Sequence, residues 1–67
     1  MNERKVRETL KQNIMRTEYH WITPSVLNDL LDQGIESIQR NLNEGNIDLV
    51  DEKVTNYVSY KLVDQLH

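Results

Sequence analysis

The sequence predicts an all-α protein built as a small bundle of three helices. Apolar residues recur at helical spacing in three segments, near residues 2–19, 24–44 and 47–65. Two short connections separate these segments, and the chain has no internal repeat, low-complexity tract or linker. Because short connections favour antiparallel neighbours, we expect the three helices to pack together in a single domain of residues 1–67.

The first segment, 2–19, has the narrowest apolar stripe, formed by Val6, Leu10 and Ile14 at intervals of four residues. A row of cations lies beside this stripe. Most such rows are simply solvated faces of a helix, and we interpret this one first in that way. The alternative is a basic helix that contacts nucleic acid. The cations of this row are Arg4, Arg7 and Lys11.

The first connection contains two of the four aromatic residues, in the run Tyr19-His20-Trp21-Ile22. One large ring buries about as much surface as two aliphatic side chains, so we expect Trp21 and Ile22 to cover the end of the bundle as a plug. In the alternative, Trp21 is an exposed aromatic anchor for a partner, because tryptophan is enriched at interface hot spots.

The second segment, 24–44, has a start signal, a full apolar stripe and a stop signal. Thr23 offers a hydroxyl to an early backbone N–H, and Pro24 needs no donor at the first helical position. Gly45 supplies the stop. The apolar face spans about 140° and contains Leu27, Leu30, Leu31, Ile35, Ile38 and Leu42. The opposite face carries an acidic line, a possible docking surface, which consists of Asp29, Asp32 and Glu36.

Two residues interrupt this apolar face, Gly34 and Asn41, one heptad apart. Gly34 is either a helix end that splits the segment or a site where another helix comes close, and we favour the close approach, which would explain a loss of about 1 kcal/mol relative to alanine. Asn41 is either a hydrogen-bonded residue at the edge of the face or a residue in a helix seam that fixes register.

The third segment, 47–65, follows a possible cap at Asn46 or Asp48. Its predicted core face contains Val50, Val54, Tyr57, Val58, Leu62 and Leu66. A second, sparser row lies away from that face. Scattered apolar residues are normal on a surface, but the spacing of seven, four and three also fits a contact face for self-association or a partner. The members of this row are Leu49, Asn56, Tyr60 and Val63.

The length of 67 residues and the absence of cysteine predict one thin core without a disulfide or a thiolate zinc site. A chain this short buries only about 60% of the surface of its unfolded form, so we expect it to oligomerise or to bind a partner. It has no long apolar run and no basic-then-apolar leader, which predicts a cytoplasmic protein that does not enter a membrane.

The net charge of −3 is unevenly distributed along the chain. Residues 1–20 carry five cations and three acids, a net charge of +2, whereas residues 21–67 carry three cations and eight acids, a net charge of −5. This polarity suits head-to-tail contacts or docking on a charged partner.

The sequence contains no pattern that predicts catalysis. No serine lies in a glycine-rich elbow, and His20 and His67 are far apart in sequence. No HExxH, CxxC or calcium-loop spacing occurs, and the two glycines do not form a phosphate loop. We therefore expect a protein that is not an enzyme and holds neither a cofactor nor a metal.

Nucleic-acid binding is the less favoured function. The run LLDQGIESIQRNL superficially resembles a helix-turn-helix with Gly34 at its turn, but the recognition helix would carry only Arg40 as a cation. Phosphate contacts require several cations. If the protein binds nucleic acid, we expect a small regulator that uses the basic first helix.

The function that these patterns favour is protein–protein interaction. The thin core, the second row of the third segment, the acidic line and the basic first segment all leave surfaces to be occupied. We expect a regulatory or inhibitory adaptor, active by occluding the surface of a protein partner of unknown identity, and a homodimer. Size and charge suit the small adaptors of bacteria and their phages, by analogy alone.

Overall fold

Helix α1 (Glu3–Glu18) begins at a cap provided by Asn2. In the computed structural model, which describes residues 1–67, the Asn2 side chain accepts a hydrogen bond from the backbone N–H of Lys5 at 3.2 Å. The cap satisfies one of the donors that every helix start leaves unpaired. The buried apolar side chains of this helix are Val6, Leu10 and Ile14.

Helix α2 (Pro24–Asn43) begins where its sequence predicts and ends one residue before the predicted end at residue 44. The Thr23 hydroxyl accepts a hydrogen bond from the backbone N–H of Val26 at 3.2 Å, and Pro24 occupies the first turn. Gly45 follows the helix with a φ of 76°, a conformation that favours glycine. The helix is continuous through Gly34, and its buried apolar side chains are Leu27, Leu30, Leu31, Ile35 and Ile38.

Helix α3 (Glu52–Asp64) begins later than the sequence predicted, at Glu52 rather than near residue 47. Its cap is Asp51, whose side chain accepts from the backbone N–H of Val54 at 3.0 Å, and neither Asn46 nor Asp48 has this role. The connection that precedes the helix packs Ile47 and Val50 against the core. Both side chains are partly buried in this non-helical connection.

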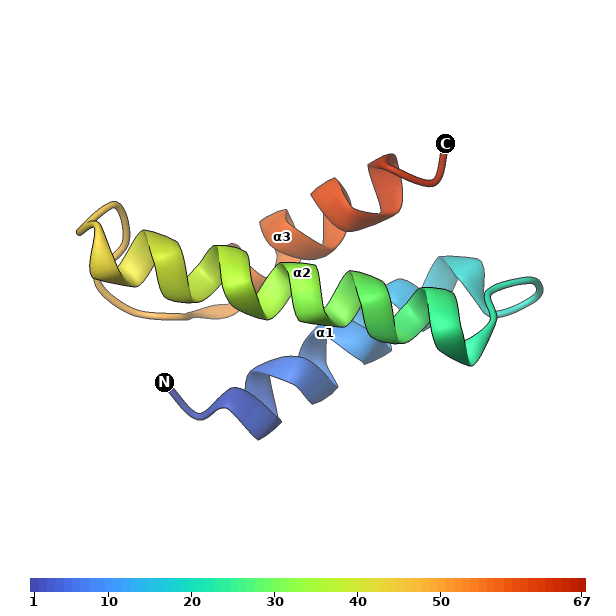
Figure 1. Cartoon of the computed structure of the whole chain (residues 1–67), viewed down its shortest axis with the longest axis horizontal. Coiled ribbons are helices and arrows are strands. Elements are labelled where there is room, and N and C mark those ends of the chain that lie inside the picture. Colours follow the sequence, from blue (N-terminus) through green and yellow to red (C-terminus); the bar gives the residue numbers. More distant parts are fainter.

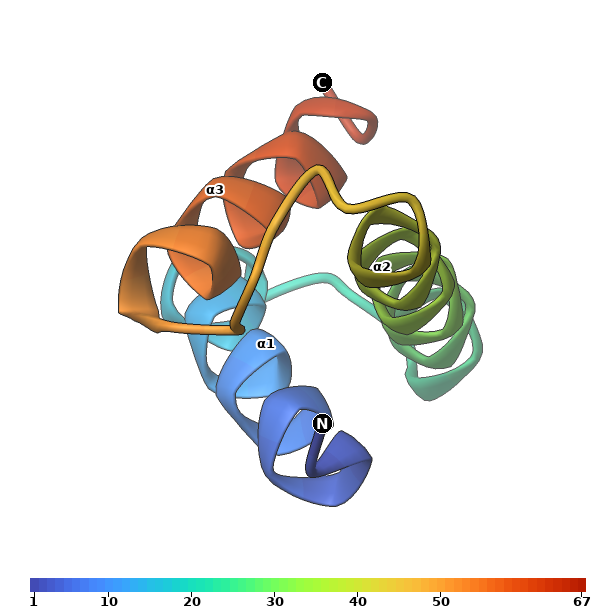
Figure 2. The same ribbon diagram turned by 90° about the vertical axis from the view of Figure 1, so that its left-hand side faces the viewer.

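The chain runs along the long axis of the molecule three times (Figure 1), so that α2 is antiparallel to both of its neighbours. Viewed end-on, α1 and α3 lie on one side and α2 on the other (Figure 2). Helix α3 packs more extensively against α1 than against α2. The core is a single cluster of nine apolar side chains, eight of which come from α1 and α2, with Leu62 from α3.

The buried face of α3 differs from the predicted one. Tyr57, placed in the core by its spacing, is 62% exposed, whereas Thr55 and Ser59 are buried. Both hydroxyls donate to carbonyl oxygens one turn back in the same helix, Ser59 to Thr55 at 2.7 Å and Thr55 to Asp51 at 3.2 Å. Because these polar groups are satisfied locally, their burial carries no penalty for an unpaired donor.

Candidate functional site

The three seams of the bundle differ in their polar side-chain contacts. Arg7 of α1 donates to Asp32 of α2 at 2.8 Å. Asn13 of α1 donates to Asn56 and Ser59 of α3 at 3.2 and 3.1 Å. No side-chain hydrogen bond or ion pair joins α2 to α3. The α2–α3 seam is therefore held by apolar contact alone.

A groove follows this seam on the outside of the molecule. It consists of two adjoining cavities of about 280 and 390 Å³, which share Ser37, Tyr57 and Val58 in their linings. Val54 and Val58 line it but are only partly buried, because no side chain of the chain covers them. We name this surface the α2–α3 groove, and its apolar floor contains Gly34, Ile38, Val54, Val58 and Leu62.

Tyr57 stands at the rim of the α2–α3 groove and is 62% exposed. The Lys61 ammonium lies 5.8 Å from the centre of its ring, a cation–π geometry. An exposed aromatic ring over a partly buried apolar floor is typical of an interface, since tyrosine offers a large contact area and loses little conformational entropy on binding.

The rim of the α2–α3 groove is basic although residues 21–67 are acidic overall. That part of the chain has three cations, and all three line the groove: Arg40, Lys53 and Lys61. Of its eight acids, Glu36 alone lines the groove. The sequence signal for this arrangement is Lys53, Tyr57 and Lys61 at intervals of four, which places them on one face of a helix.

Gly34 and Asn41, the two residues that interrupt the apolar face of α2, both line the α2–α3 groove. A Cβ at Gly34 would lie 3.0 Å from Cδ1 of both Leu10 and Leu62. Asn41 donates to the carbonyl oxygen of Ser37 at 2.7 Å and accepts from Asn46 at 3.0 Å. Asn41 thus fastens the connection to the end of α2 and bonds to no other helix.

The predicted second row of α3 is divided in the structure. Leu49 lies in the connection before α3 and is 62% exposed. The other three members line a cavity of about 280 Å³ between α1 and α3, where Tyr60 is 64% exposed. We name this surface the Tyr60 face, and it is lined by Asn13, Arg16, Thr17, Asn56, Ser59, Tyr60 and Val63.

The acidic line of α2 is partly neutralised. Asp32 pairs with Arg7 of α1, and Glu36 pairs with Arg40 of α2 at 3.5 Å, which leaves Asp29 without an ion-pair partner. Both pairs lie at the surface, where such interactions contribute little to stability. The exposed face of α2 therefore carries less unpaired negative charge than its sequence suggests.

The three cations of the basic row line a shallow cavity between α1 and α2, with Arg4, Arg7 and Lys11 around the apolar side chains of Met15 and Ile22. Glu8 lies among them, and Arg7 is bonded to Asp32. These two acids reduce the positive field of the cavity, which disfavours the phosphate contacts that nucleic-acid binding requires.

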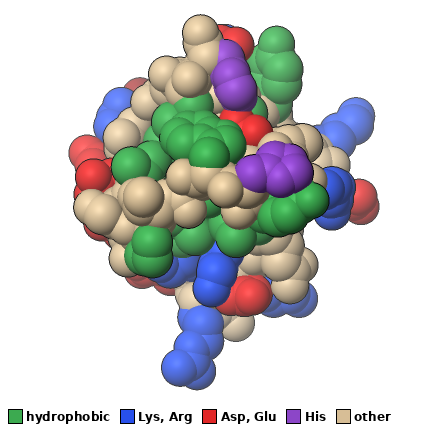
Figure 3. Space-filling view, turned by 90° about the vertical axis from the view of Figure 1, so that its right-hand side faces the viewer, with side chains coloured by type: hydrophobic (Ala, Val, Ile, Leu, Met, Phe, Trp, Pro, Cys, Tyr) green, Lys and Arg blue, Asp and Glu red, His purple; other side chains and the backbone are tan.

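The end of the molecule near the first connection carries aromatic side chains. Ile22 packs against the core, whereas Trp21 is 48% exposed and Tyr19 is 62% exposed. Figure 3 shows hydrophobic side chains around the two histidines at this end. His67 contacts Glu18, which is buried and takes no other side-chain partner. The contact ties the last residue of the chain to the end of α1.

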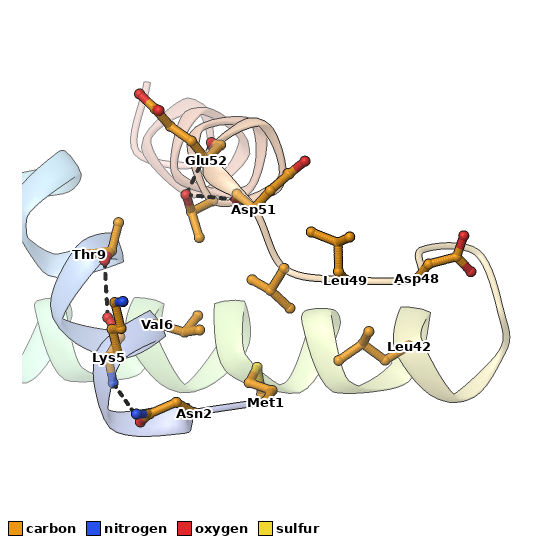
Figure 4. A pocket seen from close by; sticks show the side chains of 12 residues that line it. Met1, Asn2, Lys5, Val6, Thr9, Leu42, Asp48, Leu49, Asp51 and Glu52 are labelled. Carbon is orange, nitrogen blue, oxygen red and sulfur yellow. Dashed lines mark hydrogen bonds between the residues drawn. The ribbon is translucent and has the colours of Figure 1, made fainter.

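The largest cavity, about 580 Å³, lies between the start of α1 and the connection before α3 (Figure 4). Its side-chain hydrogen bonds are local: Asn2 accepts from Lys5, Thr9 donates to the carbonyl oxygen of Lys5, and Asp51 caps α3. The Thr55 hydroxyl, which also lines the cavity, donates to the carbonyl oxygens of Asp51 and Glu52. Asp48 and Glu52 point away from the space in Figure 4. No polar group converges on this cavity, so it offers a ligand little beyond apolar contact.

No group of three or more histidine, aspartate or glutamate side chains lies close enough together to hold a metal ion. None of the helices combines the length and the apolar character that a membrane span requires. Comparisons with protein-family models, with curated proteins and with solved structures found no match for this chain. Among the surfaces described, the α2–α3 groove combines an exposed tyrosine, partly buried valines and a basic rim.

Proposed function

We propose that this protein is a protein–protein interaction module that holds a helix of its partner in the α2–α3 groove. By covering one face of that helix, the module occludes a surface that the partner uses elsewhere, as a regulatory or inhibitory adaptor does. The supporting observation is the partly buried floor of Val54 and Val58 beneath the exposed Tyr57, along the seam that no polar side-chain contact crosses.

The shape of the groove suits a helix better than a small molecule. It runs along α3, whose 13 residues span about 20 Å. A helix of three to four turns would match this length and could place apolar side chains at every third or fourth position on the floor. Burial of the floor would also add apolar contact to a core that is thin because the chain is short.

We also propose that the protein self-associates as a homodimer through the Tyr60 face. Two copies related by a twofold axis present the same surface to each other, so each Tyr60 would be buried once in the partner protomer. This surface lies on the α1 side of α3, and the α2–α3 groove lies on its other side. A homodimer of this kind leaves both grooves open.

The test of groove binding is a comparison of two tyrosine variants. A protein captured by the wild-type chain is purified, and its Kd is measured for the wild type, for Tyr57→Asp and for Tyr60→Asp. Both tyrosines are more than 60% exposed, so neither change should disturb the fold. We expect Tyr57→Asp to weaken binding about tenfold or more and Tyr60→Asp to leave it within about twofold. Equal affinities of the wild type and Tyr57→Asp would overturn the proposal.

A further inference from the structure

We infer that the helix held in the α2–α3 groove is amphipathic and acidic, with carboxylates on both sides of its apolar seam. This inference rests on the proposed function and adds the chemistry of the partner. It is based on the positive charge at the rim of the groove, on the lack of strong ion pairs to those cations and on their positions along the groove.

Charge is segregated between the groove rim and the rest of residues 21–67. Residues 21–67 have a net charge of −5, yet the groove rim within them carries three cations and one acid, a net charge of +2. Fields of exposed charges fall off over about 8 Å at physiological salt, so a bound helix would respond chiefly to the rim beside it. Acids farther away would offset little of this attraction, whereas Glu52, beside Lys53, and Asp64, one turn after Lys61, lie close enough to reduce it.

The cations of the rim form no strong ion pair within the chain. Lys53 and Lys61 form no ion pair. Arg40 reaches only Glu36, at 3.5 Å, and both side chains are more than 60% exposed. An exposed pair of this length contributes little, so Arg40 can exchange it for a carboxylate on the bound helix at small cost.

The cations of the rim stand on both sides of the groove. Lys53 and Lys61 stand on the α3 side of the groove, eight residues and about 12 Å apart, and Arg40 stands on the α2 side. A helix in the groove would match this pattern with two acids seven or eight residues apart on one flank and one acid on the other. Apolar side chains between the flanks would cover Val54 and Val58.

A second copy of the chain does not provide such a helix. The exposed acids of α2 lie on a face that has no apolar seam, because the apolar residues of that helix are committed to the core. Asp48 and Leu49 combine an acid with an exposed apolar side chain, but they lie in the connection and outside the helices. In α1 the exposed acids Glu3 and Glu8 lie on a helix with five cations. In α3 the exposed acids Glu52 and Asp64 lie on the same face as Tyr60, which the proposed dimer covers. We therefore assign the acidic helix to a different protein.

The test uses labelled synthetic helical peptides of about 14 residues, the length of α3. All share one apolar seam, and the flanks carry glutamate, glutamine or lysine. Fluorescence anisotropy at low and physiological salt gives the Kd for each. We expect the glutamate peptide to bind the wild-type chain about tenfold more tightly than the glutamine peptide and to weaken with salt, while the lysine peptide does not bind.

The decisive variant is Lys53→Glu/Lys61→Glu, with Lys5→Glu/Lys11→Glu as the matched control on α1. The first should weaken the glutamate peptide about tenfold or more and allow the lysine peptide to bind, because the charges of the rim are then reversed. The control has the same change in net charge and should leave the affinity for the glutamate peptide within about twofold. Gain of binding by the lysine peptide would also show that the variant is folded.

The possible failures separate this inference from the proposed function. If the glutamate and glutamine peptides bind equally and Tyr57→Asp weakens both, the groove binds helices but the acidic partner is wrong. If Lys5→Glu/Lys11→Glu abolishes binding and the groove variant does not, the peptide binds at α1 and the inference is overturned. If no peptide binds, the inference also fails, and the proposed function then depends on the tyrosine variants alone.

Discussion

Gly34 of α2 lies so close to Leu62 of α3 that a Cβ at position 34 would stand 3.0 Å from Leu62 Cδ1. The same Cβ would stand 3.0 Å from Cδ1 of Leu10 in α1 and 3.4 Å from Cγ1 of Val58. All three helices therefore meet at this glycine. Because position 34 has no side chain, α2 can approach the other two helices closely. Gly34 also forms part of the floor of the α2–α3 groove.

We expect Gly34→Ala to lower the free energy of unfolding by about 1 kcal/mol. Helix propensity favours alanine by about 1 kcal/mol, but overpacking a core costs about 1–3 kcal/mol. Leu10 is fully buried, so its side chain cannot move away from the added methyl group toward solvent. Gly34→Val should be worse by a further 1 kcal/mol or more, roughly, because it adds two methyl groups to the same space. Urea unfolding measures both changes.

The control for Gly34 is Gln39→Gly on the exposed face of the same helix, which isolates the propensity term and should cost about 1 kcal/mol. If Gly34→Ala instead raised the free energy of unfolding by about 1 kcal/mol, the full gain in helix propensity, the side chains of Leu10 and Leu62 would have to move away from the added methyl group at no cost. The three helices would then not be tightly packed at this position.

The bounds of α2 were predictable because their determinants are local. A threonine before a proline starts a helix, and a glycine with positive φ follows its end, whatever the rest of the chain does. The start of α3 was not predictable in this way, since Asn46, Asp48 and Asp51 are all competent caps. In the structure the connection packs Ile47 and Val50 against the core before the helix begins, a tertiary contact that no local pattern encodes.

The groove shows a second limit of sequence patterns. Spacing places Tyr57 beside Val54 and Val58 in a core face, but α3 is rotated so that Thr55 and Ser59 lie inside. A pattern read by hydrophobicity misses this rotation, because it assigns hydroxyl side chains to the surface although they can be satisfied within the helix. The spacing of Lys53, Tyr57 and Lys61 indicates the α3 side of the basic rim. The α2 side, with Arg40, can be identified only from the tertiary structure.

We expect Asp51→Ala to lower the free energy of unfolding by about 1 kcal/mol, because it removes the acceptor for the backbone N–H of Val54 at the start of α3. Asp51→Asn keeps an acceptor and should remain close to the wild type. Thermal or urea unfolding of the two variants measures the difference.

Asp48→Ala is the comparison that tests where α3 begins. Asp48 is exposed and caps no helix, so its loss should change the stability by less than about 0.5 kcal/mol. A large loss at position 48 together with a small one at position 51 would contradict the helix start at Glu52 and would support the earlier start that the sequence suggested.

We expect the fluorescence of Trp21, the sole tryptophan, to report a partly solvated ring. With 48% of the residue exposed, the emission maximum should lie to the red of a buried tryptophan, and acrylamide should quench it efficiently. The chain unfolded in urea provides the fully exposed reference. A blue emission that resists quenching would contradict this exposure and would favour the plug over the end of the bundle.

We expect Tyr60→Asp to abolish the proposed self-association. In a twofold dimer each substitution is applied twice, so that two carboxylates would replace the two aromatic rings at the interface. Arg16, the one cation of this face, would offset only part of the cost of burying them, and the apolar contact of the rings would be lost. Sedimentation should find a dimer for the wild type and a monomer for Tyr60→Asp, with unchanged circular dichroism because the side chain is 64% exposed in the single chain.

Tyr57→Asp carries the same change on the groove side of α3 and should sediment as the wild type does. A wild type that stays monomeric at every concentration would remove the homodimer. Loss of the dimer in Tyr57→Asp alone would instead move self-association from the Tyr60 face to the α2–α3 groove.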